Sequence, residues 1–300
     1  MGTCVVPWTE RLAFDEKAFR AEVRDIARVL TRELYIFGTA GEGYAVTDAQ
    51  FERIARVFLE ECEGAGAAPT LGVISLSLPT VLERIERGCA WGFGRFQISL
   101  PSWGALDDRE LANFFRETCG RFRDRRFMHY NLLRAKRLVT PEEYGRLAEE
   151  HENLVAAKNT TDDEAFLADL LGRAPQLQHF LGERGYARMR DRHECGLLIS
   201  LATTNPRRAH EFFSARGDRL AEMLDGLQAA REALFEAVGP RAHIDGAFDK
   251  LLYKLRQPAF PLRLLPPYAS ADEGAFDRYR EALARRAPEW LPPADAPGAA

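Results

Sequence analysis

The sequence is short of lysine, of closely spaced cysteines and of long apolar runs. Only five of its 41 basic residues are lysines, so arginine supplies nearly all of the positive charge. The five cysteines are odd in number and form no CxxC pair, which favours reduced thiols over a disulfide framework or a zinc site. No apolar run approaches the roughly 18 residues of a membrane span. Glu10 and Arg11 interrupt the first apolar stretch before a secretory signal develops, so we expect a cytoplasmic protein with no membrane partner.

Charge and motif content exclude several further classes. The formal net charge of −4 and the absence of a basic run predict no nucleic-acid partner. The opening VVPWTE (5–10) contains no glycine, which argues against a dinucleotide-binding enzyme. Clustered ligands for a metal-dependent aldolase are also missing, since the six histidines show no HxH or HxxxH spacing. We therefore expect no catalytic metal.

Short apolar runs alternate with helical patterns along the first two thirds of the chain. Eight strand candidates are present, at 4–6, 34–37, 70–75, 95–99, 127–131, 153–158, 177–181 and 196–200. Parallel strands joined by right-handed crossovers follow from this order, and eight such units close into a barrel. The sequence thus predicts an α/β fold, a (β/α)8 TIM barrel, with an open doubly wound sheet as the structural alternative.

The alternation of strand and helix patterns stops near residue 216. Helical patterns at 218–237, 241–255 and 272–287 follow, with proline-rich joints between them. We expect a barrel domain over 1–215 that carries the active site, and a C-terminal helical extension over 216–300 packed on it. The Pro/Ala-rich tail from about 288 is expected to be flexible.

One of the few lysines, Lys158, ends the apolar strand NLVAAK (153–158). Burial at such a position disfavours the charged amine, so the pKa should fall and the neutral amine become a nucleophile for a ketone or aldehyde. Arginine cannot take this role because it stays protonated. The alternative is a lysine at the barrel rim that pairs with an acid such as Asp162.

Two other strand ends carry residues suited to the same chemistry. The glycines of GTAGEG (38–43) allow a tight turn that presents backbone N–H groups to a carboxylate or phosphate. The stretch HYN (129–131) places Tyr130 where a phenol could transfer protons. Taken singly, the glycine turn is also compatible with close packing and the tyrosine with a packed amphipathic side chain.

Together, these stretches resemble the dihydrodipicolinate synthase and N-acetylneuraminate lyase family of Schiff-base aldolases. The order of GTAGEG, YN and a lysine 28 residues beyond the tyrosine carries the resemblance. GE (182–183), GLLISLATTNP (196–206) and the opening VVPW (5–8) extend it over about residues 3 to 260.

The resemblance implies a role for each matching residue. Lys158 would form the imine, Tyr130 would transfer protons, and Thr39 would relay them through its hydroxyl. The backbone N–H groups of Thr39 and Ala40 would hold the carboxylate of a 2-oxo acid. The family also implies a homotetramer, a dimer of dimers, with a homodimer as the smaller possibility, and no metal or organic cofactor for the chemistry. The expected substrate-binding residues are Ala40, Gly41, Trp103, Arg134 and Glu183.

The sequence departs from the family pattern at several of these positions. Ala40 replaces the usual second hydroxyl residue, and Trp103 stands near the tyrosine that completes the proton relay in the synthase branch. The family pattern has an arginine five residues after the tyrosine, and here that position is Ala135, flanked by Arg134 and Lys136. These changes argue against the lysine-biosynthetic synthase itself. A lyase or aldolase that releases or condenses pyruvate is expected first and a sugar-acid dehydratase second, with an inactive barrel that binds ligands as a further alternative.

Overall fold

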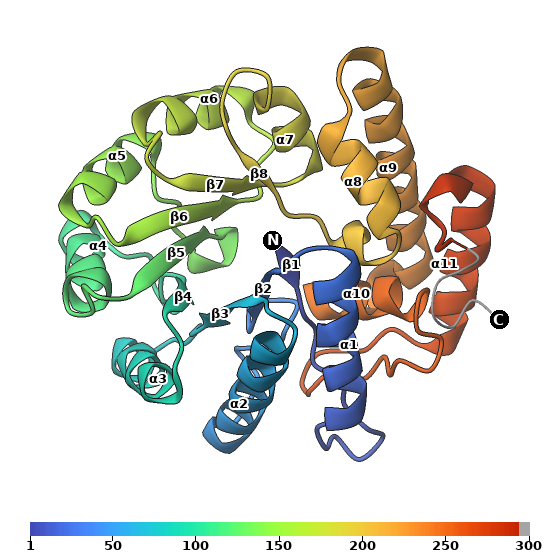
Figure 1. Ribbon diagram of the computed structural model, residues 1–300, viewed down its shortest axis with the longest axis horizontal. Coiled ribbons are helices and arrows are strands. Elements are labelled where there is room, and N and C mark those ends of the chain that lie inside the picture. The colour runs from blue at the N-terminus through green and yellow to red at the C-terminus, as the bar shows by residue number, and fades with distance from the viewer. Residues whose placement is uncertain (294–300) are drawn as a thin grey trace. The chain divides into compact units, whose positions relative to one another are not determined.

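Eight strands alternate with helices along the chain, which is the order of a (β/α)8 barrel, as the sequence predicts (Figure 1). A computed structural model describes residues 1–293 and divides into two compact units. The first contains Met1 and Pro69–Leu198, and the second contains Gly2–Ala68 together with the chain from Ile199 onward. Each unit is described separately below.

The first unit holds consecutive strand and helix repeats. Its strands pair parallel in chain order, from β3 with β4 to β7 with β8. Helices α5 and α6 cover one face of β5 to β7 (Figure 1). The elements are β3 (Ala68–Gly72), α3 (Leu78–Trp91), β4 (Arg95–Ile98), α4 (Asp108–Phe115), β5 (Arg126–Asn131), α5 (Pro141–Glu150), β6 (Leu154–Asn159), α6 (Glu164–Arg173), β7 (Gln178–Leu181), α7 (Glu183–Met189) and β8 (Gly196–Leu197).

Helix α5 shows how the local sequence fixes an element next to the site. Thr140 caps it by accepting a hydrogen bond from Glu143 N, while the Glu143 side chain accepts one from Thr140 N. Pro141 follows at the first helical position, where its missing N–H has no cost. The helix then buries Tyr144 and Leu147. Helix α5 therefore begins at a point that its own capping residues fix, directly after the loop that follows β5.

The second unit contains the first two strands and the C-terminal helices. Its elements are β1 (Gly2–Thr3), α1 (Glu16–Val29), β2 (Glu33–Ile36), α2 (Asp48–Gly64), α8 (Pro206–Ser214), α9 (Gly217–Val238), α10 (Asp245–Lys254) and α11 (Glu273–Arg286). Helices α9 and α11 lie side by side (Figure 1). The three helical segments expected after residue 216 are thus present.

Both ends of the second unit refine the sequence expectation. The first strand was expected at 4–6, but its ladder with β2 covers Gly2 and Thr3. A single bond, Cys4 N to Tyr35 O at 3.0 Å, continues the ladder. Near the other end, Pro288–Trp290 forms a 3-10 turn with Trp290 fully buried. The rest of the expected flexible tail, 294–300, lies outside the described residues.

Over residues 1–293, no helix combines the length and apolar character needed to cross a bilayer. In the same range, no group of three or more histidine, cysteine or acidic side chains is placed to hold a metal ion.

Candidate active site

Tyr130 on β5 and Lys158 on β6 are direct partners in the parallel ladder. Side chains that face each other across neighbouring strands project on the same side of the sheet. The Lys158 amine accordingly lies over the Tyr130 ring, with Nζ 3.9 Å from the ring centroid. On the other side of β6, Lys158 pairs with Phe180 of β7. The expected amine and phenol are therefore brought together at the carboxyl ends of two adjacent strands.

Burial of Lys158 bears on the choice between an active amine and a rim cation. The side chain is 9% exposed and Tyr130 is 5% exposed. Asp162, the acid suggested as its rim partner, instead has its carboxylate 3.8 Å from the Arg184 guanidinium. The Lys158 amine is therefore largely removed from water and is not an exposed rim cation paired with Asp162.

The loops after β4 and β5 carry the other expected substrate residues of this unit. Trp103 is 83% exposed, and its carbonyl accepts a hydrogen bond from Lys136 Nζ at 2.8 Å. Arg134 lies in a short 3-10 turn, Leu133–Ala135, and is exposed. Ala135, where the family pattern expects arginine, is buried at 2% exposure. A long cation at that position would have to enter the protein interior, whereas Arg134 reaches the surface.

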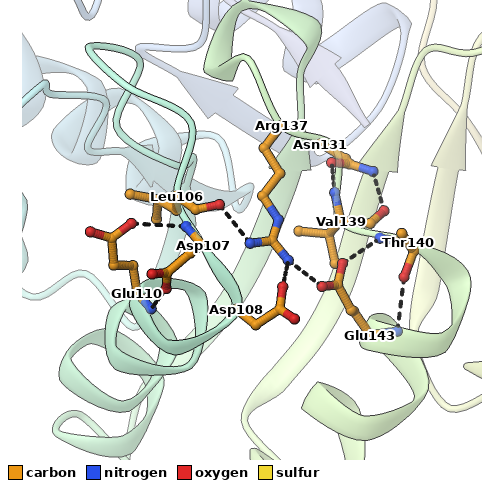
Figure 2. A network of polar contacts seen from close by, with 9 residues as sticks. All are labelled: Leu106, Asp107, Asp108, Glu110, Asn131, Arg137, Val139, Thr140 and Glu143. Atoms are coloured by element: carbon orange, nitrogen blue, oxygen red, sulfur yellow. Dashed lines mark hydrogen bonds and ion pairs between the residues drawn. The ribbon is translucent and has the colours of Figure 1, made fainter.

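Arg137 fixes the loop after β5 to the loop after β4 (Figure 2). Its guanidinium donates to Leu106 O at 2.6 Å, to Asp108 Oδ1 at 2.7 Å and to the Glu143 carboxylate. Asp108 opens α4, and Glu143 lies in the first turn of α5. The segments that carry Trp103 and Arg134 are therefore tied to the starts of two helices.

Glu183 begins α7, directly after Gly182, at the carboxyl end of β7. It is half-buried. This is the position expected from the GE pair in the sequence.

The glycine turn GTAGEG belongs to the second unit and is separated from β2 by Phe37 alone. A Cβ on Gly41 would lie 2.8 Å from Phe37 N, closer than real contacts allow, so this position requires glycine. Phe37 and Glu42 both have positive φ, +61° and +56°, which is uncommon for residues other than glycine. The turn is therefore tight and needs external support.

Glu42 supplies that support through a fully buried carboxylate. Its oxygens accept hydrogen bonds from Trp8 Nε1 at 2.9 Å, Lys250 Nζ at 2.6 Å and Leu265 N at 2.7 Å. Burial lowers the pKa of Lys250, and the Glu42 carboxylate opposes this shift. The sequence reasoning missed Lys250, although its rarity as one of five lysines was a signal that could have marked it.

Thr39 and Ala40 are buried in the turn, at 3% and 7% exposure. Among residues 1–293, neither backbone N–H donates a hydrogen bond to the protein. Buried N–H groups are usually satisfied, so two neighbouring donors without an acceptor suit an anionic ligand. This is the feature expected of a carboxylate-binding turn.

Comparisons with solved structures show that other proteins share this fold. No protein-family profile and no curated protein sequence matches the chain. Among solved structures, YagE, a prophage protein of the dihydrodipicolinic acid synthase family from E. coli K12 in complex with pyruvate, has a TM-score of 0.84 and 16% identity, covering 95% of this chain and 97% of that one. Dihydrodipicolinate synthase from Thermotoga maritima has a TM-score of 0.81 and 19% identity, covering 97% and 98%.

A third similar structure is the Sulfolobus sulfataricus 2-keto-3-deoxygluconate aldolase in complex with D-KDPG, with a TM-score of 0.78, 14% identity and 94% of both chains covered. At these identities the likeness concerns the fold. The resemblance first seen in GTAGEG, YN and Lys158 is thus confirmed by structure neighbours that include members of that family, and the chain has the (β/α)8 fold found in dihydrodipicolinate synthases and 2-keto-3-deoxygluconate aldolase.

Proposed function

We propose that this protein is a class I lyase or aldolase that forms a Schiff base between Lys158 and a 2-oxo acid. The observation that carries the proposal is the buried Lys158 amine held 3.9 Å from the Tyr130 ring centroid at the carboxyl edge of β5 and β6. Structural likeness to YagE, solved with pyruvate, and to an aldolase supports it.

In the proposed reaction, the neutral Lys158 amine adds to the ketone carbon of the 2-oxo acid. The resulting carbinolamine loses water to give an iminium ion, which accepts the electron pair released when the adjacent carbon–carbon bond breaks. The aldehyde leaves after its hydroxyl has lost a proton, and the enamine that remains is protonated. Water then hydrolyses the imine, releasing pyruvate and the free amine. Tyr130 is assigned the proton transfers.

Binding of the substrate carboxylate is assigned to the N–H groups of Thr39 and Ala40, with the Thr39 hydroxyl as a proton relay. Gly41 keeps the turn narrow enough to present these donors. Specificity for the rest of the substrate is assigned to Trp103, Arg134 and Glu183. No metal or organic cofactor takes part in this proposal.

Borohydride trapping tests the imine directly. The protein is incubated with pyruvate and sodium borohydride, digested, and analysed by mass spectrometry for a reduced adduct on Lys158. We expect the adduct in the wild type and its loss in Lys158→Ala. Lys17→Ala, which removes an exposed lysine, is the matched control and should keep the adduct. Turnover retained by Lys158→Ala would overturn the mechanism.

A screen of 2-oxo acids separates the lyase from its alternatives. Released pyruvate, measured for each compound, supports the lyase or aldolase. A product that keeps every carbon but has lost water supports a sugar-acid dehydratase or a synthase-like enzyme using the same imine. Ala40 and Trp103, which depart from the family pattern, favour the inactive binding barrel if no 2-oxo acid gives an adduct.

We also propose that a second copy of the chain covers the apolar loops of the first unit. Leu76, Trp103 and Leu133 are 58%, 83% and 78% exposed. They follow β3, β4 and β5, three neighbouring parallel strands, so they share one edge of the sheet. A homotetramer formed as a dimer of dimers, or a homodimer, would bury them. Sedimentation of wild type and Leu133→Glu tests this, and a wild-type monomer would contradict it.

The remaining assignments follow from the proposed activity. The active site is assigned to a barrel domain over 1–215, with 216–300 as a helical extension. A cytoplasmic location fits a small-molecule enzyme with unpaired cysteines, and fractionation of cells expressing the protein would test it.

A further inference from the structure

Two buried amides end the strands that carry Tyr130 and Lys158. Asn131 and Asn159 are direct partners in the ladder, each one residue beyond the proposed catalytic side chain. Because successive residues of a strand face opposite sides, these amides lie on the face away from Tyr130 and Lys158. They are 4% and 2% exposed, and Asn131 Nδ2 donates to Asn159 Oδ1 at 2.9 Å.

Asn131 makes two further hydrogen bonds, both to the backbone of Val139, and these fix the orientation of its amide. Its Oδ1 accepts from Val139 N at 2.9 Å, and its Nδ2 also donates to Val139 O at 3.0 Å (Figure 2). Since Val139 N can only donate, the Asn131 oxygen must face it, which leaves the amino group for Val139 O and Asn159. One side chain therefore closes the loop after β5 and joins β5 to β6.

Neighbouring polar groups on this face are neutral. The Tyr144 hydroxyl of α5 lies 2.6 Å from His129 Nδ1. Burial lowers the pKa of His129 to about 3, and burial raises the pKa of Tyr144, while the Asn159 side chain partly offsets the latter shift. At neutral pH the four side chains of this amide network, defined as His129, Asn131, Tyr144 and Asn159, thus carry no charge.

We propose that the Asn131–Asn159 pair positions Lys158 against Tyr130 by holding the ends of β5 and β6 in register. This inference rests on the proposed Schiff-base function. Strand ends are where ladder hydrogen bonds open most easily, and a change of register moves side chains away from their partners. The pair adds a side-chain bond at the last ladder position, directly beyond the reacting groups. Its neutral amides do this without placing a carboxylate next to the amine.

The test measures the rate of pyruvate imine formation by borohydride trapping at saturating pyruvate. Asn159→Leu removes the acceptor while keeping a similar volume, and should slow imine formation about 10- to 100-fold because small misplacements of reacting groups are costly. The pyruvate concentration for half-maximal rate should change little. Asn159→Asp keeps an oxygen acceptor for Asn131 and should recover much of the rate when each variant is compared at its own optimal pH.

Asn153 offers a matched control at the other end of the same strand. It precedes β6, and its Nδ2 donates at 3.0 Å to each of Cys119 O, Phe122 O and Arg125 O. Asn153→Leu should lower thermal stability but leave the rate of imine formation unchanged. If Asn159→Leu does not fold, Asn159→Ala, which leaves room for water, takes its place.

The outcomes separate this inference from the proposed function. Failure to trap any adduct on wild-type Lys158 removes the Schiff-base function itself. A wild-type adduct with an unchanged rate in Asn159→Leu overturns the positioning role alone. Equal slowing by Asn153→Leu and Asn159→Leu would also overturn it, because general loss of stability would then explain both.

Discussion

Two buried polar networks support the proposed catalytic segments, and they differ in charge. In the first unit, the amide network holds β5 and β6 with neutral groups. In the second unit, Glu42 and Lys250 form a fully buried ion pair beneath the glycine turn. Asp25 and Arg256 form another buried pair there, with Asp25 Oδ2 2.9 Å from Arg256 Nη2. The network that joins the ends of β5 and β6 is therefore neutral, whereas the network that holds the glycine turn is ionic.

The difference follows from what each network must hold. Phe37, just before the glycine turn, and Glu42 within it both have positive φ, so a strong, multiply bonded carboxylate is needed to maintain this conformation. In the proposed mechanism Lys158 has the opposite requirement, since a nearby carboxylate would favour its charged, unreactive form. Amides supply directed hydrogen bonds without that penalty. The type of buried polar group, charged at the glycine turn and neutral next to Lys158, thus corresponds to what each neighbouring segment needs.

The largest expected effect is on the ionic network. Glu42→Gln leaves the buried Lys250 ammonium without its counter-charge, so we expect a loss of about 3–5 kcal/mol in the free energy of unfolding. Urea denaturation measures it. The amide variant Asn159→Leu, which leaves no unpaired charge, should lose only about 1 kcal/mol. Similar losses for both variants would remove the proposed contrast.

Acidification should weaken the amide network through His129. Its pKa is lowered to about 3 in the folded protein by burial, whereas an unfolded histidine has a pKa of about 6.5. The unfolded state therefore binds more protons between these values, and this contribution to stability is lost as pH falls from about 6.5 toward 3, at up to ~1.4 kcal/mol per pH unit. Unfolding curves of wild type and His129→Gln measure it, and the variant should have the shallower pH dependence. If wild type and His129→Gln lose stability equally as pH falls, His129 is not the source of the pH dependence.

The ionic network should respond in the opposite direction through Glu22 of α1. Burial raises its pKa well above the ordinary value, although its bond from Val5 N at 2.8 Å and the nearby Lys250 oppose this. The folded state thus keeps a proton that the unfolded state releases above about pH 4.3, so stability falls as pH rises from that value toward the raised pKa of the folded state. Glu22→Gln should flatten this decline between pH 5 and 8. A steeper decline in the variant would show that Glu22 is ionised when folded.

The smallest expected effect concerns an exposed ion pair of the first unit. Asp108 is 85% exposed, although its partner Arg137 also bonds Leu106 O and Glu143. Asp108→Asn should therefore change the free energy of unfolding by less than about 1 kcal/mol. Chemical denaturation beside Glu42→Gln gives the measurement. A loss as large as that of Glu42→Gln would show that solvent exposure does not determine how much an ion pair contributes to the free energy of unfolding.

Much of the site could be predicted from the chain because its parts are local. Strand ends are marked by apolar runs followed by polar turns, and residues at such ends meet on one edge of a parallel sheet. This reasoning placed Tyr130 and Lys158 together, and the ladder confirms it. It could not reveal Asn131 and Asn159 as partners, since exact register depends on backbone pairing. Nor could it find Lys250, which contacts Glu42 across 208 residues of sequence.

The sequence by itself determined the alternation of strands and helices and the strand-end positions of Lys158, Tyr130 and the glycine turn. Those features arise from periodicity, capping and backbone sterics within short segments. Only the tertiary structure decided that Lys158 is buried against a tyrosine ring, that Ala135 points inward while Trp103 is exposed, and that one buried network is neutral and the other charged. Burial and long-range pairing decide these points, because desolvation depends on every segment that packs around a group.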